Sequence, residues 1–154
     1  MSFSLTTIVK LIISILLPVF VSVVIYVLDK RTKFGNIRYI PKQIIIGTTF
    51  GIIAILATEY GVPVDGAVLN VRSASPLSAG LIFGWPAGLI AGFIGGIERY
   101  LTPTGDFTRI ACTFGTIIAG FVAALVRKFM LDNKRPSWFY GLVVGLVTEV
   151  IHML

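Results

Sequence analysis

Long apolar runs separated by short polar segments dominate the chain. Residues Leu5–Leu28 and Gln43–Thr58 carry a single charged residue between them, Lys10, and Phe107–Arg127 is also largely apolar. About 20 consecutive apolar residues are enough for a helix to cross the hydrocarbon core of a bilayer. The pattern therefore predicts membrane-spanning helices over these ranges, and a last span that begins near Trp138.

A glycine-rich stretch lies between the second and third of these runs. Its glycines recur at every fourth residue: Gly80, Gly84, Gly88, Gly92 and Gly96. On a helix this spacing makes one smooth face. Because proline lacks an N–H and disfavours α geometry in the residue before it, Trp85-Pro86 predicts a break. We expect two half-helices, Ser73–Phe83 and Pro86–Arg99, each too short to cross a membrane comfortably.

The composition agrees with a membrane protein. Of the 154 residues, 56% are hydrophobic and 13% are charged, whereas a soluble domain has about 25% charged residues. The sequence predicts one all-α integral membrane domain, a polytopic helical bundle with a broken, glycine-rich hairpin. Its single cysteine and single histidine offer no disulfide, metal set or nucleophile–base pair, so neither a cofactor nor catalysis is expected of this chain.

The charges are clustered rather than spread over the chain. Of the 13 lysines and arginines, many fall in Asp29–Lys42 and Arg127–Pro136, so the net charge of +6 indicates membrane topology and not nucleic-acid binding. The positive-inside rule places both segments in the cytoplasm and the N-terminus outside. The region between them must then cross an even number of times. A re-entrant hairpin and two short crossings both satisfy this rule.

Several polar residues fall at the outer level in this topology: Asn70, Arg72, Glu98, Arg99, Tyr100 and Arg109. Arginine grips carboxylates through a planar fork of donors, and at a helix centre it costs roughly 2.5–3.5 kcal/mol on insertion scales. Arg72 and Arg99 beside the broken hairpin therefore indicate a site for a small anionic ligand. The alternative is that these arginines snorkel to the interface or pair with Glu98 or Asp106.

Two further groups could contribute polar chemistry. Arg109, Cys112, Thr113 and Thr116 share one helix face and could form the wall of a cavity, or Cys112 could be a small buried residue with the threonines bonded back to their helix. Glu149 and His152 form an intramembrane polar pair that is either functional or a helix–helix hydrogen bond. The pairs Gly47/Gly51 and Gly141/Gly145 are expected to permit close helix packing.

The chain resembles the LYT-type five-transmembrane receptor domain of LytS-like sensors over essentially its whole length. The matching pieces are Asn70-Val71-Arg72, the Gly80–Gly96 run, Glu98-Arg99-Tyr100, Ala111-Cys112 before Gly115-Thr116-Ile117, and Glu149–Leu154. The resemblance implies a sensory input domain over residues 1–154 that ends inside its penultimate span and acts as a homodimer in the bacterial plasma membrane. It also implies a cytoplasmic histidine kinase or diguanylate cyclase module elsewhere in the full-length protein.

The resemblance also suggests a ligand. In relatives that sense pyruvate, two arginines, a cysteine and a serine are taken to hold it, and these correspond here to Arg72, Arg99, Cys112 and Gly115. Relatives often have serine at the last position, so Thr113 or Thr116 would supply the hydroxyl. A weaker similarity to the substrate-binding subunits of vitamin transporters gives the alternative function.

Overall fold

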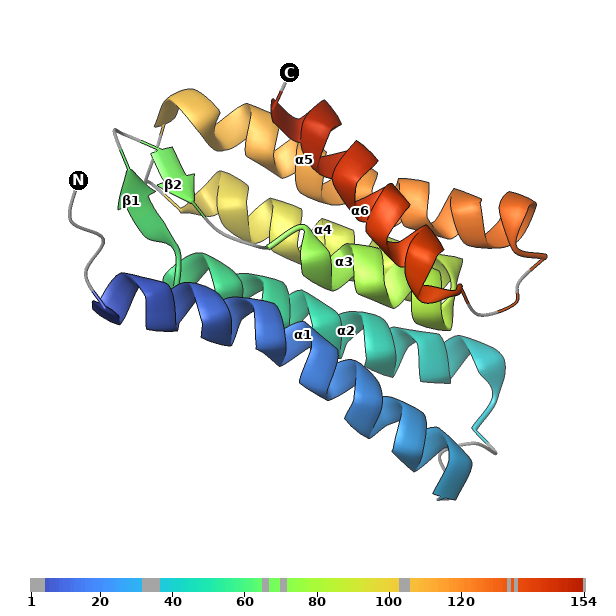
Figure 1. Ribbon diagram of the computed structural model, residues 1–154. Helices are drawn as coiled ribbons and strands as arrows, with labels where there is room; N and C mark the ends of the chain where they lie inside the picture. The colour runs from blue at the N-terminus through green and yellow to red at the C-terminus, as the bar shows by residue number, and fades with distance from the viewer. Residues whose placement is uncertain are drawn as a thin grey trace.

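The computed structural model describes residues 5–31, 37–64, 67–69, 72–102, 106–132, 134 and 136–153. It is a helical bundle with one short β-hairpin (Figure 1). The elements, in chain order, are α1 (Leu5–Arg31), α2 (Tyr39–Glu59), β1 (Val62–Val64), β2 (Ala67–Leu69), α3 (Ala74–Ser78), the π-helical turn η2 (Ala79–Phe83), α4 (Trp85–Leu101), α5 (Asp106–Leu125), the π-helical turn η3 (Val126–Met130) and α6 (Trp138–Met153).

Three helical segments are long and apolar enough to cross a membrane, namely residues 8–31, 39–59 and 109–130. The outward surfaces of these helices are apolar, as expected of surfaces that meet lipid; Leu16 and Phe20 of α1, for example, are 58% and 68% exposed. The predicted all-α membrane fold is therefore confirmed. Two further apolar helices, Ala74–Phe83 and Phe139–Thr148, are shorter.

The segment after α2 forms a short β-hairpin. Strands β1 and β2 pair antiparallel, with Val62 opposite Leu69 and Val64 opposite Ala67. The sequence between the paired ends is Asp-Gly, a dipeptide that favours two-residue hairpin connections, and valine suits a strand. The Asp-Gly dipeptide and the flanking valines thus favour this β-hairpin locally, although the apolar pattern did not predict it.

The predicted helix break is present and falls at Gly84, one residue before Trp85-Pro86. Gly84 has φ 132° and ψ 174°, a conformation that is essentially restricted to glycine. Pro86 then lies in the first turn of α4, where its missing N–H leaves no hydrogen bond unmade. The half-helix before the break ends in a π turn, η2, in which the Gly84 N–H bonds to the Ala79 carbonyl at 3.2 Å.

Glycines let the central helices approach closely. Helix α4 lies between α2 and α5. Its glycines pack against α5, and on its other side Ile90 and Ile94 pack against Gly47 and Gly51 of α2. A Cβ built on Gly120 of α5 would lie 2.3 Å from the Gly88 carbonyl oxygen, and one on Gly88 would lie 2.6 Å from the Gly80 Cα. The expected glycine packing is therefore observed on α2 and α4, and Gly120 of α5 adds a close contact that was not predicted.

The Gly141/Gly145 pair of α6 does not behave as expected. A Cβ added at either glycine would meet no described atom within 4 Å. Helix α6 instead packs on the bundle through other positions, including the buried Val144 and Thr148. The face of α6 that carries Gly141 and Gly145 therefore does not pack against the described residues of this chain.

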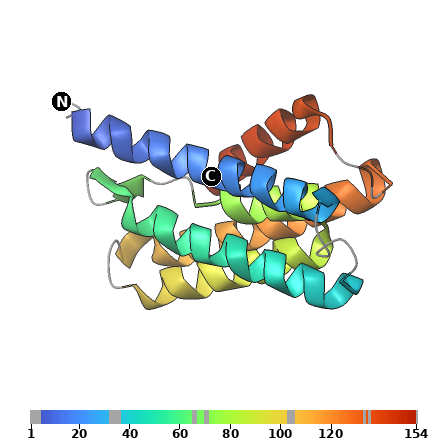
Figure 2. The same ribbon diagram turned by 90° about the horizontal axis from the view of Figure 1, so that it is seen from below.

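The described parts of the two basic segments lie at the same end of the bundle. The end of α1, the start of α2, the turn η3 and the start of α6 are together at this end, opposite the β-hairpin (Figures 1 and 2). Lys42 of α2 forms an ion pair with Asp29 of α1 there. The break at Gly84 is at this end too, because a Cβ on Gly84 would be 3.1 Å from the Tyr39 hydroxyl. The hairpin of η2 and α4 thus reaches the level at which α2 begins.

Candidate functional site

Arg72 lies immediately before α3 and is 1% exposed. The turn that carries it is fixed by hydrogen bonds from the Ser75 N–H to the Arg72 carbonyl and from the Leu77 N–H to the Ser73 carbonyl. Its guanidinium donates from Nη1 to the Thr58 hydroxyl at 3.2 Å. Arg72 therefore belongs to the interior of the bundle and does not snorkel to the surface.

Two more donors of Arg72 reach helix α5. Its Nε donates to the Thr116 hydroxyl at 3.1 Å, and its Nη2 to the Cys112 carbonyl at 3.5 Å. The Thr116 hydroxyl in turn donates to the Cys112 carbonyl at 2.8 Å, and the Thr58 hydroxyl to the Ala54 carbonyl at 3.1 Å. Both threonines thus use their own proton within their helix and keep a lone pair for Arg72.

Arg99, in the last turn of α4, is also 1% exposed. It continues the buried small face formed by Gly92, Gly95 and Gly96, so the helix directs it inward. Arg72 lies in the connection to α3, outside the long membrane-spanning helices, and burial lowers the pKa of its guanidinium. The positive charge of Arg99 also lowers this pKa, whereas Cys112 and Glu98 oppose the change.

Gly95 provides the space in which this site is built. A Cβ at this position would lie 2.9 Å from the Ala54 Cβ, 3.4 Å from the Thr116 Cγ2 and 3.9 Å from the Arg72 Cδ. Because α2, α4, α5 and the start of α3 converge here, a larger residue would collide first with the Ala54 side chain of α2. Gly95, which lies outside the four-residue glycine repeat, therefore allows α2, α5 and Arg72 to pack closely against α4.

The other predicted site residues divide into three groups. Cys112 is half-buried and contributes its carbonyl, whereas the Thr113 hydroxyl donates to the Arg109 carbonyl at 2.8 Å and has no described contact with Arg72. Arg109 stacks on the Tyr100 ring with its Cζ 5.3 Å from the ring centroid. Asn70 and the side chains of Glu149 and His152 lie outside the part of the chain that the structure describes.

Glu98 is held by Thr102. The Thr102 hydroxyl lies 2.6 Å from Glu98 Oε1 and 2.9 Å from the Glu98 carbonyl, one helical turn earlier. Among the described residues, no group of histidine, cysteine and carboxylate side chains could hold a metal ion. The described site is therefore one of two buried guanidiniums, hydroxyls and a backbone carbonyl.

The C-terminal end of the first half-helix, formed by α3 and η2, has its own polar contacts. Gln43 of α2 is 3% exposed and donates from Nε2 to the Phe83 carbonyl at 2.9 Å. Arg127 of η3 donates from Nη1 to the Leu81 carbonyl at 2.9 Å. A helix that stops leaves carbonyls without partners in its own chain segment, and these two side chains satisfy them. Gln43, Arg127 and Thr58 were not among the predicted site residues, because each contacts a residue distant in sequence.

These features define a class: a multi-pass helical membrane domain with a broken helix and a pair of buried arginines. The family described as 5TMR of 5TMR-LYT matches residues 25–154. The chain belongs to this family, as the sequence resemblance predicted.

Three curated relatives show similarity over about three quarters of the chain. The sensor histidine kinase YpdA of Escherichia coli K12 is 35% identical over 74% of this chain, and the sensor histidine kinase BtsS of the same organism is 28% identical over 75%. The sensor protein LytS of Streptococcus mutans is 22% identical over 73%. The aligned region is 20–22% of these relatives, so the chain spans about a fifth of their length. No solved structure matches the chain.

Proposed function

We propose that this domain is the sensory input of a signal-transduction receptor and binds a small carboxylate through Arg72 and Arg99. The observation that carries the proposal is the burial of two guanidiniums, each 1% exposed, where Arg72 packs on α4 beside Gly95, one helical turn before Arg99. Two buried guanidiniums beside the Glu98 carboxylate still carry a net positive charge, and burying a net charge is unfavourable. A carboxylate between them would accept charge-assisted hydrogen bonds and remove their repulsion. Pyruvate or a ligand of similar size is the first candidate.

The proposed orientation follows from the basic end of the bundle. Because the described parts of Asp29–Lys42 and Arg127–Pro136 both meet this end, it is the cytoplasmic one, and the buried Arg72 lies on the extracytoplasmic side of the Gly84 break. The break at Gly84 lies beside Tyr39 at the start of α2, which supports two crossings by the Ser73–Arg99 hairpin over a shallow re-entrant loop. The N-terminus is then outside.

Cysteine labelling tests this orientation. In a Cys112→Ala background, we expect a membrane-impermeant maleimide to label Asp65→Cys and Thr104→Cys in intact cells, and to label Lys134→Cys only after permeabilisation. Lys134 is exposed at the basic end, so poor access would not explain its silence in intact cells. Labelling of Lys134→Cys but not Asp65→Cys in intact cells would reverse the orientation.

The relatives are sensor kinases of which this chain covers about a fifth. We propose that a cytoplasmic histidine kinase module, outside residues 1–154, converts ligand capture into output, and that the full-length receptor works as a homodimer. The half-helix of α3 and η2 connects Arg72 to the basic end of the bundle, where Gln43 and Arg127 bind its last carbonyls. A ligand can shift the equilibrium between two arrangements of these helices only by as much as it binds one arrangement more tightly than the other.

A chimera tests the sensory role. Residues 25–154 would replace the aligned region of the Escherichia coli YpdA kinase, and autophosphorylation would be measured in vesicles with a panel of short carboxylates. We expect at least one carboxylate to change the rate, and the Arg72→Ala, Arg99→Ala double variant to be insensitive to it. Equal autophosphorylation responses of the chimera and this variant to every carboxylate would contradict the sensory role. If vesicles that contain this chain and a transporter energising module also take up substrate, the chain is instead a transporter's substrate-binding subunit.

A further inference from the structure

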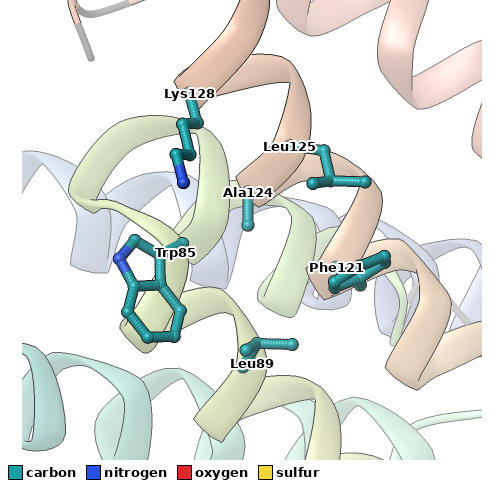
Figure 3. A pocket seen from close by; sticks show the side chains of 6 residues that line it. All are labelled: Trp85, Leu89, Phe121, Ala124, Leu125 and Lys128. Carbon is teal, nitrogen blue, oxygen red and sulfur yellow. The ribbon is translucent and has the colours of Figure 1, made fainter.

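An apolar pocket lies where the start of α4 meets the end of α5 and η3, far from the arginine pair. It has a volume of about 220 Å³. Six side chains line it: Trp85, Leu89, Phe121, Ala124, Leu125 and Lys128 (Figure 3). Trp85 and Phe121 are 51% and 48% exposed, so the pocket opens on the outer surface of the bundle, where lipid surrounds a membrane protein.

The lining is divided into a polar and an apolar part. Lys128 extends from η3 toward Trp85, and the indole nitrogen of Trp85 lies on the side of its ring turned away from Leu89 and Phe121 (Figure 3). The Lys128 ammonium is also 5.5 Å from the centroid of the Phe129 ring. One cation and one N–H donor thus stand beside a surface that offers only hydrocarbon.

The position of the pocket matches the headgroup region of a bilayer. Lys128 belongs to the basic segment Arg127–Pro136, in which Asp132 is the single acid. Basic residues at this level attract anionic lipid, and a tryptophan at the end of a membrane helix is typical of the interface. Charge complementarity therefore favours a negatively charged lipid over a zwitterionic one.

We propose that this pocket binds an anionic phospholipid of the leaflet at the basic end of the bundle. The phosphate contacts the Lys128 ammonium and the Trp85 indole N–H, and the upper part of an acyl chain packs on Leu89, Phe121 and Leu125. A lipid held in this way contacts α4 directly after the Gly84 break and α5 at the same level. The proposal goes beyond the carboxylate site and does not depend on it.

Quenching of Trp85 fluorescence by brominated phospholipids tests the proposal. The chain has two tryptophans, so Trp138→Phe leaves Trp85 as the only reporter. This variant would be reconstituted in phosphatidylcholine bilayers with increasing amounts of dibrominated phosphatidylglycerol or dibrominated phosphatidylcholine. We expect phosphatidylglycerol to occupy the site about fivefold more strongly, as expected for one lysine at a membrane surface.

Matched charge variants separate a site from a diffuse surface potential. Lys128→Gln should abolish the preference for phosphatidylglycerol and Lys128→Arg should keep it, whereas Lys134→Gln, an exposed lysine that does not line the pocket, should leave it unchanged. Lys128 is itself exposed, so these variants disturb no buried packing. Equal quenching by both lipids overturns the proposal, and so does an equal effect of Lys128→Gln and Lys134→Gln.

Discussion

Replacing Arg72 or Arg99 by alanine is expected to weaken the binding of a small carboxylate by about 10- to 150-fold. This range corresponds to the loss of one charge-assisted hydrogen bond, roughly 1.5–3 kcal/mol. Arg→Lys at either position should also weaken binding, because an ammonium cannot form the two parallel bonds of a guanidinium. Calorimetry on purified protein with two- to four-carbon carboxylates measures these differences.

The control for this series is Arg31→Ala. Arg31 is exposed at the opposite end of the bundle, so its removal changes the net charge equally and should leave carboxylate affinity unchanged. Thermal unfolding of each variant separates a lost ligand contact from a lost fold. Unaltered binding by a folded Arg72→Ala, Arg99→Ala double variant would rule out the proposed site.

Gly120→Ala is expected to destabilise the bundle by roughly 1–3 kcal/mol, the usual cost of overpacking a close-packed interior. The added methyl would lie 2.3 Å from the Gly88 carbonyl oxygen and 3.3 Å from the Pro76 Cβ. Since the nearest atom is backbone, the methyl can be accommodated only if α4 and α5 move apart. Thermal unfolding in detergent or lipid nanodiscs measures the loss.

Gly141→Ala is the matched control. The substitution is the same and also lies within a helix, but the added methyl meets nothing within 4 Å. Because alanine favours helix over glycine by about 1 kcal/mol, this variant should be as stable as the parent or slightly more stable. Equal destabilisation by both substitutions would contradict the close approach of α4 and α5.

The main features of the fold follow from patterns within short stretches of sequence. The apolar runs, the glycine repeat and the Trp85-Pro86 break each act through local backbone geometry, which explains why the sequence predicts them well. The β-hairpin also had a local signal in Asp65-Gly66, but its strands are only three residues each. Such short strands carry little periodicity, so the apolar pattern alone could not reveal them.

The site was only partly predictable, for a different reason. Arg72 and Arg99 stand out because charge is rare in this chain, and Cys112 and Thr116 share a helix face with a charged residue. Thr58 was not distinguishable from other threonines in apolar helices, since its role depends on a contact with Arg72, 14 residues away. Gln43 reaches Phe83 across 40 residues. Contacts of this kind depend on helix arrangement, which a sequence pattern does not specify.

The hydrogen bonds of Arg72 also constrain the order in which the domain is assembled during synthesis. Thr58 precedes Arg72 in the chain, but Thr116 and Cys112 follow it by 44 and 40 residues. When α3 leaves the ribosome, two of these three acceptors do not yet exist, and a guanidinium without acceptors is costly to place in hydrocarbon. The hydrogen bonds of Arg72 can therefore be completed only after α5 has been synthesised and has packed beside the half-helix.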